Sequence, residues 1–363
     1  MKSVENRWEG LLWPPLSGPA WGRAVLFPLE CLSYVYGAYV RSRTRSYLEG
    51  KKSRTKVPAR VIVAGNLTVG GTGKTTLAGW IAEKLLERGH KPAVILRGYK
   101  GGGKSGPLLV SAGGGPRLEA EFAGDEAYLL SRKLRCPVLI GSDRVRAANM
   151  AIEKMGCTHL VLDDGYQHLP LERDLDILVL DSKADPQDRF LLPRGPLREP
   201  VEAAARAGIL VFSRALEGEI PDWQWPEQVC PETPRFAMRY RPEGIFDAKS
   251  SESLPLSGPY LAFSGIGTPA GFRGLLSQMG VEVVHHESFP DHHRYRDRDL
   301  ARLCKKARQK GAELLLTTEK DAVKIDPARL SGCRLAVLRI EADFMGAEDR
   351  FIETILQKTG ELT

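Results

Sequence analysis

A glycine-rich segment that follows an apolar run has the residue types needed to bind phosphate. Residues 65–76 read GNLTVGGTGKTT and lie between a predicted strand at 61–64 and a helix predicted from Lys74. Glycines let backbone N–H groups converge on phosphate oxygens, and the N-terminal end of a helix adds partial positive charge. Lys74 would bridge the β- and γ-phosphates of ATP, and the Thr75 hydroxyl would ligate Mg²⁺. The segment predicts a P-loop for Mg²⁺-ATP made of Thr68, Val69, Gly70, Gly71, Thr72, Gly73, Lys74, Thr75 and Thr76.

This loop departs from the strict P-loop pattern at one position. The pattern G-x-x-x-x-G-K-[ST] requires glycine where this chain has Thr68. Gly70 and Gly71 instead give a GG-x-GKT core, so glycines still flank the phosphate path. A glycine-rich turn with an incidental lysine is the alternative, but the strand–loop–helix context favours phosphate binding.

Two adjacent aspartates supply the carboxylate that a P-loop needs to hold Mg²⁺. Asp163 and Asp164 directly follow the apolar run at 159–162, and such an acid usually stands at the end of a neighbouring strand. Neighbouring strand residues point to opposite sides, so the two acids need not share one role. We expect Asp163 in the magnesium shell and Asp164 in an outer shell or against substrate. An acid that only caps a turn is the alternative.

Two further polar clusters bear on phosphoryl transfer to a hydroxyl. Asp125 and Glu126 open a predicted helix, where an acid by itself is interpreted as an N-cap. His292 lies in the sequence PDHH, and a histidine pair in a polar loop is more often exposed than catalytic. The reaction requires a base near the acceptor oxygen. An aspartate from one domain and a histidine from the other could form that base when the domains close.

Strands and helices alternate from residue 60 onward, and this alternation indicates what positions these side chains. Short continuous apolar strands separated by helices predict a mostly parallel sheet covered on both faces, as in P-loop NTPases. We expect strands at 61–64, 93–96, 138–140, 159–162, 177–180 and 209–212, and helices at 74–88, 125–134 and 144–155. A second, smaller α/β unit is expected with strands at 260–264, 281–285 and 313–317 and helices at 269–279 and 297–310.

The expected domain division follows from shifts in composition. It comprises an apolar helix and basic segment at 1–56, a P-loop core domain at 57–220, a Pro- and Trp-rich linker region at 221–258, and a smaller α/β domain at 259–363.

The N-terminal segment has two open interpretations. Residues 20–40 are largely apolar and aromatic, but Arg23, Pro28 and Glu30 interrupt them, so a clean spanning helix is not expected. Residues 41–60 are strongly basic. An interfacial anchor facing anionic lipid fits this pattern, and so does an ordinary helix packed on the domain and followed by a solvated basic loop.

Composition narrows the class of partner. The formal charge of +7 favours anionic partners such as phosphates and lipid headgroups. Nucleic acid is not expected, because the basic residues are not interleaved with stacking aromatics. The six cysteines form no C-x-x-C pair, which argues against a disulfide framework or zinc site and favours a reducing cytosol.

Several segments together resemble the tetraacyldisaccharide 4'-kinases, the lipid A 4'-kinases. The resemblance rests on an ordered set of motifs that runs through most of the chain, and each motif is weak by itself. The set is GNLTVGGTGKT (65–75), RGY (97–99), GDE (124–126), DDGYQH (163–168), LLPRGPLRE (191–199), SGIGTP (264–269), FPDHH (289–293) and TTEKDAVK (317–324). Thr68 agrees with the family pattern.

The resemblance implies a reaction and a place for it. The family transfers the γ-phosphoryl group of ATP to the 4'-hydroxyl of a tetraacylated glucosamine disaccharide 1-phosphate, which gives lipid IVA. Its fold is a P-loop core joined to a smaller α/β domain, with an N-terminal helix on the cytoplasmic face of the bacterial inner membrane. This favours the anchor interpretation, with a glycolipid and a membrane surface as partners and no protein partner expected.

The resemblance also implies roles for single residues. Asp125 is expected as the base, and His292 is expected to orient it and tune its pKa. Arg198 is the candidate for stabilising the transferring charge. Glu319, Lys320 and Asp321 would hold or close over the nucleotide, with Glu126 and Tyr99 as further candidates.

Two other classes of protein fit parts of the sequence. A nucleotide-dependent switch of the partitioning type has a similar loop and a tethering helix, but it would not need Asp125 and His292. Its ATPase activity would not depend on a lipid acceptor. A membrane module with a vestigial P-loop conflicts with the intact Lys74, Thr75 and Asp163.

Overall fold

The chain divides into two compact units of mixed α/β structure. The structure, a computed structural model, describes residues 20–98, 106–187, 189–215, 219–330 and 332–360. Unit 1 consists of Met1–Leu118, Leu130–Arg239 and Ala342–Thr363, and unit 2 consists of Glu119–Leu129 and Tyr240–Glu341. These units differ from the ranges expected from composition, and the expected linker region 221–258 is divided between them. Residues 119–129 cluster with unit 2, and the C-terminal helix clusters with unit 1.

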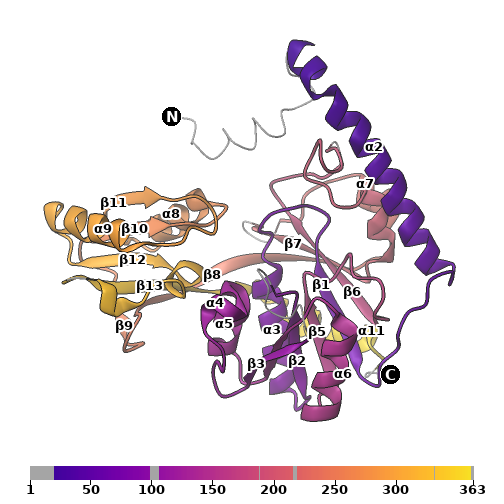
Figure 1. Cartoon of the computed structure of the whole chain (residues 1–363), viewed down its shortest axis with the longest axis horizontal. Helices are drawn as coiled ribbons and strands as arrows, with labels where there is room; N and C mark the ends of the chain where they lie inside the picture. Colours follow the sequence, from indigo (N-terminus) through magenta and orange to yellow (C-terminus); the bar gives the residue numbers. More distant parts are fainter. Residues whose placement is uncertain (1–19, 99–105, 188, 216–218, 331, 361–363) are drawn as a thin grey trace. The chain divides into compact units, whose positions relative to one another are not determined.

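Unit 1 is built on a mostly parallel sheet (Figure 1). Its strand order is β8-β7-β6-β1-β5-β2-β4-β3, and only β3 runs antiparallel to its neighbour, β4, among these described strands. The strands are β1 Arg60–Gly65, β2 Pro92–Leu96, β3 Leu108–Ala112, β4 Pro137–Ile140, β5 His159–Asp163, β6 Leu175–Asp181, β7 Ile209–Ser213 and the first part of β8 Arg235–Asp247.

Helices cover both faces of this sheet because its strands are apolar on both sides. On one face, Val61, Val63 and Ile95 pack with Ala147 and Ala148 of α6. The alternate strand residues point to the other face, where α3 contacts β1, β2 and β5. The helices of unit 1 are α2 Ala20–Leu48, α3 Lys74–Glu87, α6 Arg144–Met155, η1 Val201–Arg206, α7 Trp225–Val229, α11 Glu348–Lys358 and the second half of α5 Asp125–Lys133.

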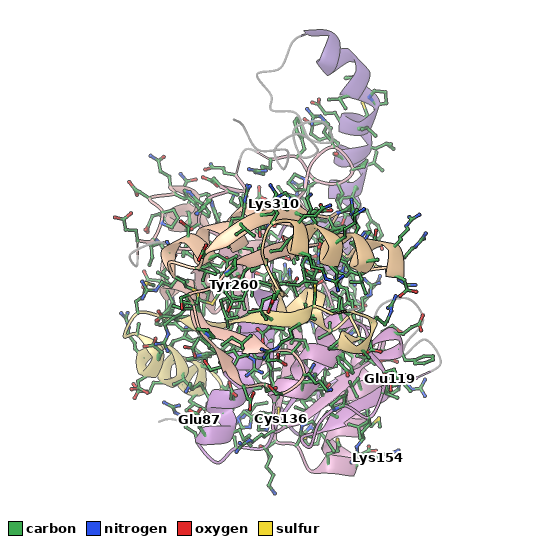
Figure 2. All side chains as sticks on the ribbon, turned by 90° about the vertical axis from the view of Figure 1, so that its left-hand side faces the viewer. Glu87, Glu119, Cys136, Lys154, Tyr260 and Lys310 are labelled. Atoms are coloured by element: carbon green, nitrogen blue, oxygen red, sulfur yellow. The ribbon has the colours of Figure 1, made fainter. Side chains whose placement is uncertain are left out.

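Unit 2 is a smaller sheet with the strand order β11-β10-β12-β13-β8, and β9 pairs with β8. One face packs on α9 through Leu300 and Leu303, and the other packs on α8 through Phe272 and Leu276. Tyr260 of β10 is fully buried, whereas Lys310 after α9 is exposed (Figure 2). The elements are α4 Ala120–Ala123, β9 Ser253–Leu254, β10 Tyr260–Ser264, α8 Pro269–Gln278, β11 Val283–Ser288, α9 Asp297–Gln309, β12 Leu314–Thr318, α10 Glu319–Ala322, η2 Pro327–Arg329 and β13 Arg334–Asp343.

Most expected strands and helices are present with small changes at their ends. Strand β11 begins two residues later than expected, because the Val281 N–H bonds back to the Leu276 carbonyl of α8 and not to the sheet. The long strands β8 and β13 and the helix α11 were not predicted. Strand β8 contains Pro242 and exposed polar residues, so its sequence does not read as a buried strand.

Helix α2 has one packed and one exposed face. Ser33, Gly37 and Val40 are buried, and their spacing places them on the same side of the helix. Leu32 and Tyr39 lie on another side and are 53% and 62% exposed. Among the described residues, no helix is long and apolar enough to cross a membrane.

Candidate functional site

The glycine-rich loop joins the end of β1 to the first turn of α3, as the strand–loop–helix pattern requires. Gly70 and Gly73 have positive φ angles of 113° and 87°, which glycine adopts without strain. A side chain at Gly71 would enter open space, so nothing in the chain itself requires glycine there. The backbone at Gly71 therefore faces open space.

Lys74, the first residue of α3, folds back along this loop. Its side chain is only 9% exposed. The ammonium Nζ donates to the Gly70 carbonyl at 3.3 Å and lies 3.7 Å from Asp164 Oδ1. A cation is thus held beside the loop backbone at a helix N-terminus, where anions are favoured.

The two adjacent aspartates have different partners. Asp163 ends β5, and its Oδ2 accepts a hydrogen bond of 2.8 Å from the Thr75 hydroxyl. Asp164 has a positive φ of 52° and accepts two bonds, of 2.8 and 2.9 Å, from Arg198 Nη1. Burial would raise the pKa of Asp164, but the charges of Lys74 and Arg198 outweigh it and hold that pKa below its ordinary value.

Arg198 is presented by a loop that is fixed on two sides. Its backbone N–H donates to the Leu67 carbonyl at 2.6 Å, so the loop lies against the glycine-rich segment. Its carbonyl accepts a bond of 3.0 Å from the Tyr36 hydroxyl of α2, and the Ser33 hydroxyl donates to the Leu191 carbonyl at 2.7 Å. Helix α2 therefore packs directly on the backbone that positions Arg198.

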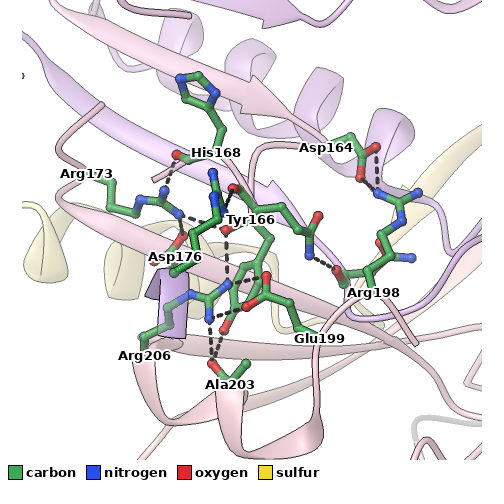
Figure 3. Close-up of polar contacts among 12 residues, drawn as sticks. Asp164, Tyr166, His168, Arg173, Asp176, Arg198, Glu199, Ala203 and Arg206 are labelled. Carbon is green, nitrogen blue, oxygen red and sulfur yellow. Dashed lines mark hydrogen bonds and ion pairs between the residues drawn. The ribbon is translucent and has the colours of Figure 1, made fainter. Parts of the chain in front are cut away.

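A buried ionic network, which was not predicted from the sequence, lies near the Asp164–Arg198 pair (Figure 3). Arg206 bonds both oxygens of Glu199, at 2.7 and 2.8 Å, and its guanidinium stacks 3.9 Å above the Tyr166 ring. Arg173 bonds Asp176 at 2.9 Å. Both arginines also donate to the Tyr166 carbonyl, so the network braces the turn that follows Asp164.

Three other residues of unit 1 support the glycine-rich loop and were also missed. Asn66 Nδ2 donates to the Thr72 hydroxyl at 3.1 Å, and Gln167 donates to the Asn66 carbonyl at 2.9 Å. Arg214 donates to the Gly71 carbonyl at 3.3 Å and pairs with Asp181. Arg214 and Asp181 stand at the carboxyl ends of β7 and β6, and that position is the signal that could have found them.

Asp125 and His292 come together in unit 2. Asp125 is the first residue of α5, and its Oδ2 lies 3.7 Å from His292 Nδ1. His292 is half-exposed and has a positive φ of 57°, which is uncommon for a non-glycine residue. Its backbone N–H donates to the Gly265 carbonyl at 3.1 Å, and its Nε2 lies 3.8 Å from Asp291. Strained backbone of this kind is concentrated at functional sites.

The TTEKDAVK segment lies beside this pair. Asp321 is fully buried, and Glu319 is 9% exposed, with its carboxylate accepting a bond of 3.4 Å from the Ile340 N–H. Lys320 pairs with Glu126 at 3.3 Å. The carboxylates of Glu319 and Asp321 are thus engaged inside unit 2. Tyr99 lies outside the described residues.

Fold and site together define a class of protein. It is an α/β protein with cationic and carboxylate groups at the carboxyl ends of parallel strands, which is where open α/β sheets bind their ligands. The model of the family described as Tetraacyldisaccharide-1-P 4'-kinase (LpxK) matches residues 25–360. The chain belongs to this family, which confirms the resemblance and the prediction that it is a kinase.

Relatives and a solved structure agree with this assignment. A tetraacyldisaccharide 4'-kinase from Anaeromyxobacter sp. (strain Fw109-5) is 38% identical, over 98% of this chain and 96% of the relative. Another, from Syntrophus aciditrophicus (strain SB), is 37% identical over 85% and 87%. The crystal structure of LpxK from Aquifex aeolicus in complex with ATP matches with a TM-score of 0.73 and 31% identity, covering 93% of this chain and 99% of that one.

Proposed function

We propose that this chain transfers the γ-phosphoryl group of ATP to the 4'-hydroxyl of a tetraacyl glucosamine disaccharide 1-phosphate. The product would be lipid IVA, and the pathway lipid A biosynthesis. The observation that carries the proposal is the family match across residues 25–360, in a chain whose Lys74 and Thr75 stand at the end of a glycine-rich loop. The LpxK structure from Aquifex aeolicus, named as an ATP complex, supports the choice of nucleotide.

Residues of unit 1 are assigned to the triphosphate. The loop at 65–76 acts as a P-loop, with backbone N–H groups and the Lys74 ammonium binding phosphate oxygens. Arg198 stabilises negative charge on the transferring group, because it is a fixed cation close to Lys74 and Asp164.

The chemistry of Thr75 and Asp163 fits a magnesium site. A hydroxyl and a carboxylate in direct contact are hard oxygen ligands of the kind that Mg²⁺ prefers. Thr75 and Asp163 would hold the ion, with Asp164 farther from it. When bound, Mg²⁺ would neutralise charge on the phosphate oxygens.

Asp125 is assigned as the base, with His292 orienting its carboxylate. Asp125 takes the proton of the acceptor hydroxyl while the hydroxyl oxygen forms its bond to the γ-phosphorus. The bond from the γ-phosphorus to the bridging oxygen breaks, and its electron pair leaves with ADP. A carboxylate with a pKa below its ordinary value is ionised at neutral pH and ready for this role.

Helix α2 is assigned to the cytoplasmic surface of the inner membrane, where an acylated substrate resides. Leu32, Val35 and Tyr39 are exposed and spaced three and four residues apart, which places them on one face. Arg41, Arg43 and Arg45 follow in the same helix and suit anionic headgroups.

The direct test is a transfer assay. Purified full-length protein is incubated with γ-labelled ATP, Mg²⁺ and the disaccharide 1-phosphate in detergent micelles. We expect label in a doubly phosphorylated glycolipid. Release of inorganic phosphate at the same rate with and without the acceptor would instead identify a nucleotide-hydrolysing switch.

A further inference from the structure

Lys324 of unit 2 lies between two carboxylates from distant parts of the sequence. Its Nζ is 3.0 Å from Asp321 Oδ1 and 3.7 Å from Asp125 Oδ2. Its side chain is 8% exposed, whereas that of Lys320 is 27% exposed and is paired with Glu126. Solvent and salt screen a buried charge much less than an exposed one, so Lys324 is the stronger cation for Asp125.

Asp321 fixes the position of this lysine. Its Oδ2 accepts bonds of 2.9 Å from the Gly265 N–H and 2.9 Å from the Thr318 hydroxyl, while Oδ1 accepts from Lys324. Any side chain at Gly265 would come within 3.2 Å of Asp321 Oδ1, so glycine permits this close approach. The Gly265 carbonyl in turn accepts the His292 N–H. The buried carboxylate of Asp321 therefore helps to fix both Lys324 and His292, which contact Asp125.

The charged groups that face Asp125 come from three segments. His292 contributes from the loop after β11, and Lys320 and Lys324 contribute from α10 and the turn that follows it. Glu126 adjoins Asp125 in α5, and Asp291 lies against the far side of the His292 ring. Burial would raise the pKa of Asp125, but its interaction with His292 and the charge of Lys324 outweigh burial and leave that pKa below its ordinary value.

We propose that Lys324 is a positioning residue for phosphoryl transfer: anchored on Asp321, it keeps the Asp125 carboxylate ionised and aimed at His292. The inference rests on the proposed role of Asp125 as the base. Without Lys324, one of the charges that offset burial at Asp125 is lost, so the pKa of Asp125 rises and the carboxyl group holds a proton at pH values where it is otherwise ionised. The protonated acid cannot accept the proton of the acceptor hydroxyl.

The test is the pH dependence of kcat/KM for transfer to the disaccharide 1-phosphate. In Lys324→Met, the acid limb is expected to move up by about one to three pH units, the effect of removing an opposite charge near a carboxylate. Lys324→Arg keeps the charge and is expected to return the limb close to that of the wild type. Lys306→Met is the matched control, because Lys306 pairs with Glu287 elsewhere in unit 2, at 3.2 Å.

A second variant distinguishes the loss of the lysine charge from misfolding. Lys324→Met leaves the fully buried Asp321 without its cation, and an uncompensated buried charge is strongly destabilising. The double variant Asp321→Asn/Lys324→Met removes both charges, and its acid limb is expected to move in the same direction.

The outcomes separate this inference from the function on which it rests. An acid limb at the wild-type pH in both Lys324→Met and Asp321→Asn/Lys324→Met, with a rate lowered equally at every pH, would overturn the role of Lys324. Wild-type protein that transfers no phosphoryl group would overturn the proposed function itself. Full turnover by Asp125→Asn with saturating acceptor would rule out Asp125 as the base, and it would also rule out the proposed role of Lys324.

Discussion

At the scale of single residues, three candidate side chains of unit 1 are each held by a hydrogen bond. Lys74 is held by the Gly70 carbonyl, Thr75 by Asp163, and Arg198 by Asp164. These contacts place two cations around one carboxylate in unit 1. Asp164 thus lies between the Lys74 ammonium and the Arg198 guanidinium.

Replacing Lys74 by alanine is expected to abolish most transfer, with a loss of about a hundredfold to a thousandfold in kcat/KM. The physical reason is that the ammonium contributes electrostatic stabilisation aimed at the phosphates, for which losses of this order are typical. The measurement is the labelled-ATP transfer assay, and circular dichroism shows whether the variant keeps its fold. Near-normal turnover by a folded variant would contradict the phosphate-binding role.

His168 gives a prediction about pH and stability. Burial and the charge of Arg144 lower the pKa of its imidazole from 6.5 to about 4, and its Nε2 is buried with no hydrogen-bond partner among the described residues. The folded state therefore binds fewer protons than the unfolded state between these values. The contribution of this histidine to the free energy of unfolding is fully present above pH 6.5 and is lost as the pH falls toward 4. In His168→Gln, Tm is expected to fall less steeply as the pH is lowered over this range. Equal slopes in the variant and the wild type would refute the lowered pKa of His168.

At the scale of elements, α2 has one face packed on unit 1 and another face that is exposed. Its buried face packs on the loop that presents Arg198, through Ser33 and Tyr36. A side chain at Gly37 would come within 2.7 Å of Leu191 Cδ1, so a larger residue there would force the Leu191 side chain to shift. The opposite face exposes large apolar side chains that nothing in unit 1 covers among the described residues.

Changing only that exposed face tests membrane association without disturbing the packed one. The triple variant Leu32→Ser, Val35→Ser and Tyr39→Ser is expected to sediment less with vesicles that contain anionic lipid, because binding scales with buried apolar area. Phe122→Ser is the control, since Phe122 is 63% exposed in unit 2. Unchanged vesicle binding by a folded triple variant would count against an anchor.

At the scale of the whole molecule, the chain passes between the two units more than once. Residues 119–129 belong to unit 2, the chain then returns to unit 1, and it enters unit 2 again at residue 240. After β13, helix α11 joins unit 1, where Phe351 packs on Trp80 of α3 and on Phe344. The C-terminal helix thus supports the helix that begins at Lys74.

Phe351→Ala is expected to destabilise the protein by about 3–5 kcal/mol, the usual cost of removing a fully buried aromatic side chain. Because α3 begins at Lys74, nucleotide affinity is expected to fall as well. Thermal unfolding and ATP titration measure the two effects. An unchanged Tm would show that α11 does not stabilise unit 1.

Much of the local structure could be predicted because apolar periodicity and glycine placement are local signals. Helix α6 and strand β10 have the expected bounds, and the glycine-rich loop lies where the pattern placed it. Strand β8 could not be predicted, because its exposed polar residues and Pro242 interrupt the apolar pattern of a buried strand. Arg206 and Glu199 were not identified as an ion pair either, because they lie seven residues apart and their pairing depends on the path of the chain through Pro200 and the short helix η1.

The sequence by itself determined the family, the parallel α/β architecture and the candidates Lys74, Thr75, Asp163, Asp125 and His292, since ordered motifs and strand ends are written in residue order. Only the tertiary structure decided which groups meet. In the folded chain, Asp125 lies beside His292 and Lys324 within one unit, and Arg198 pairs with Asp164. The physical reason is that electrostatic interaction depends on separation in space and on burial, and neither follows from distance along the chain.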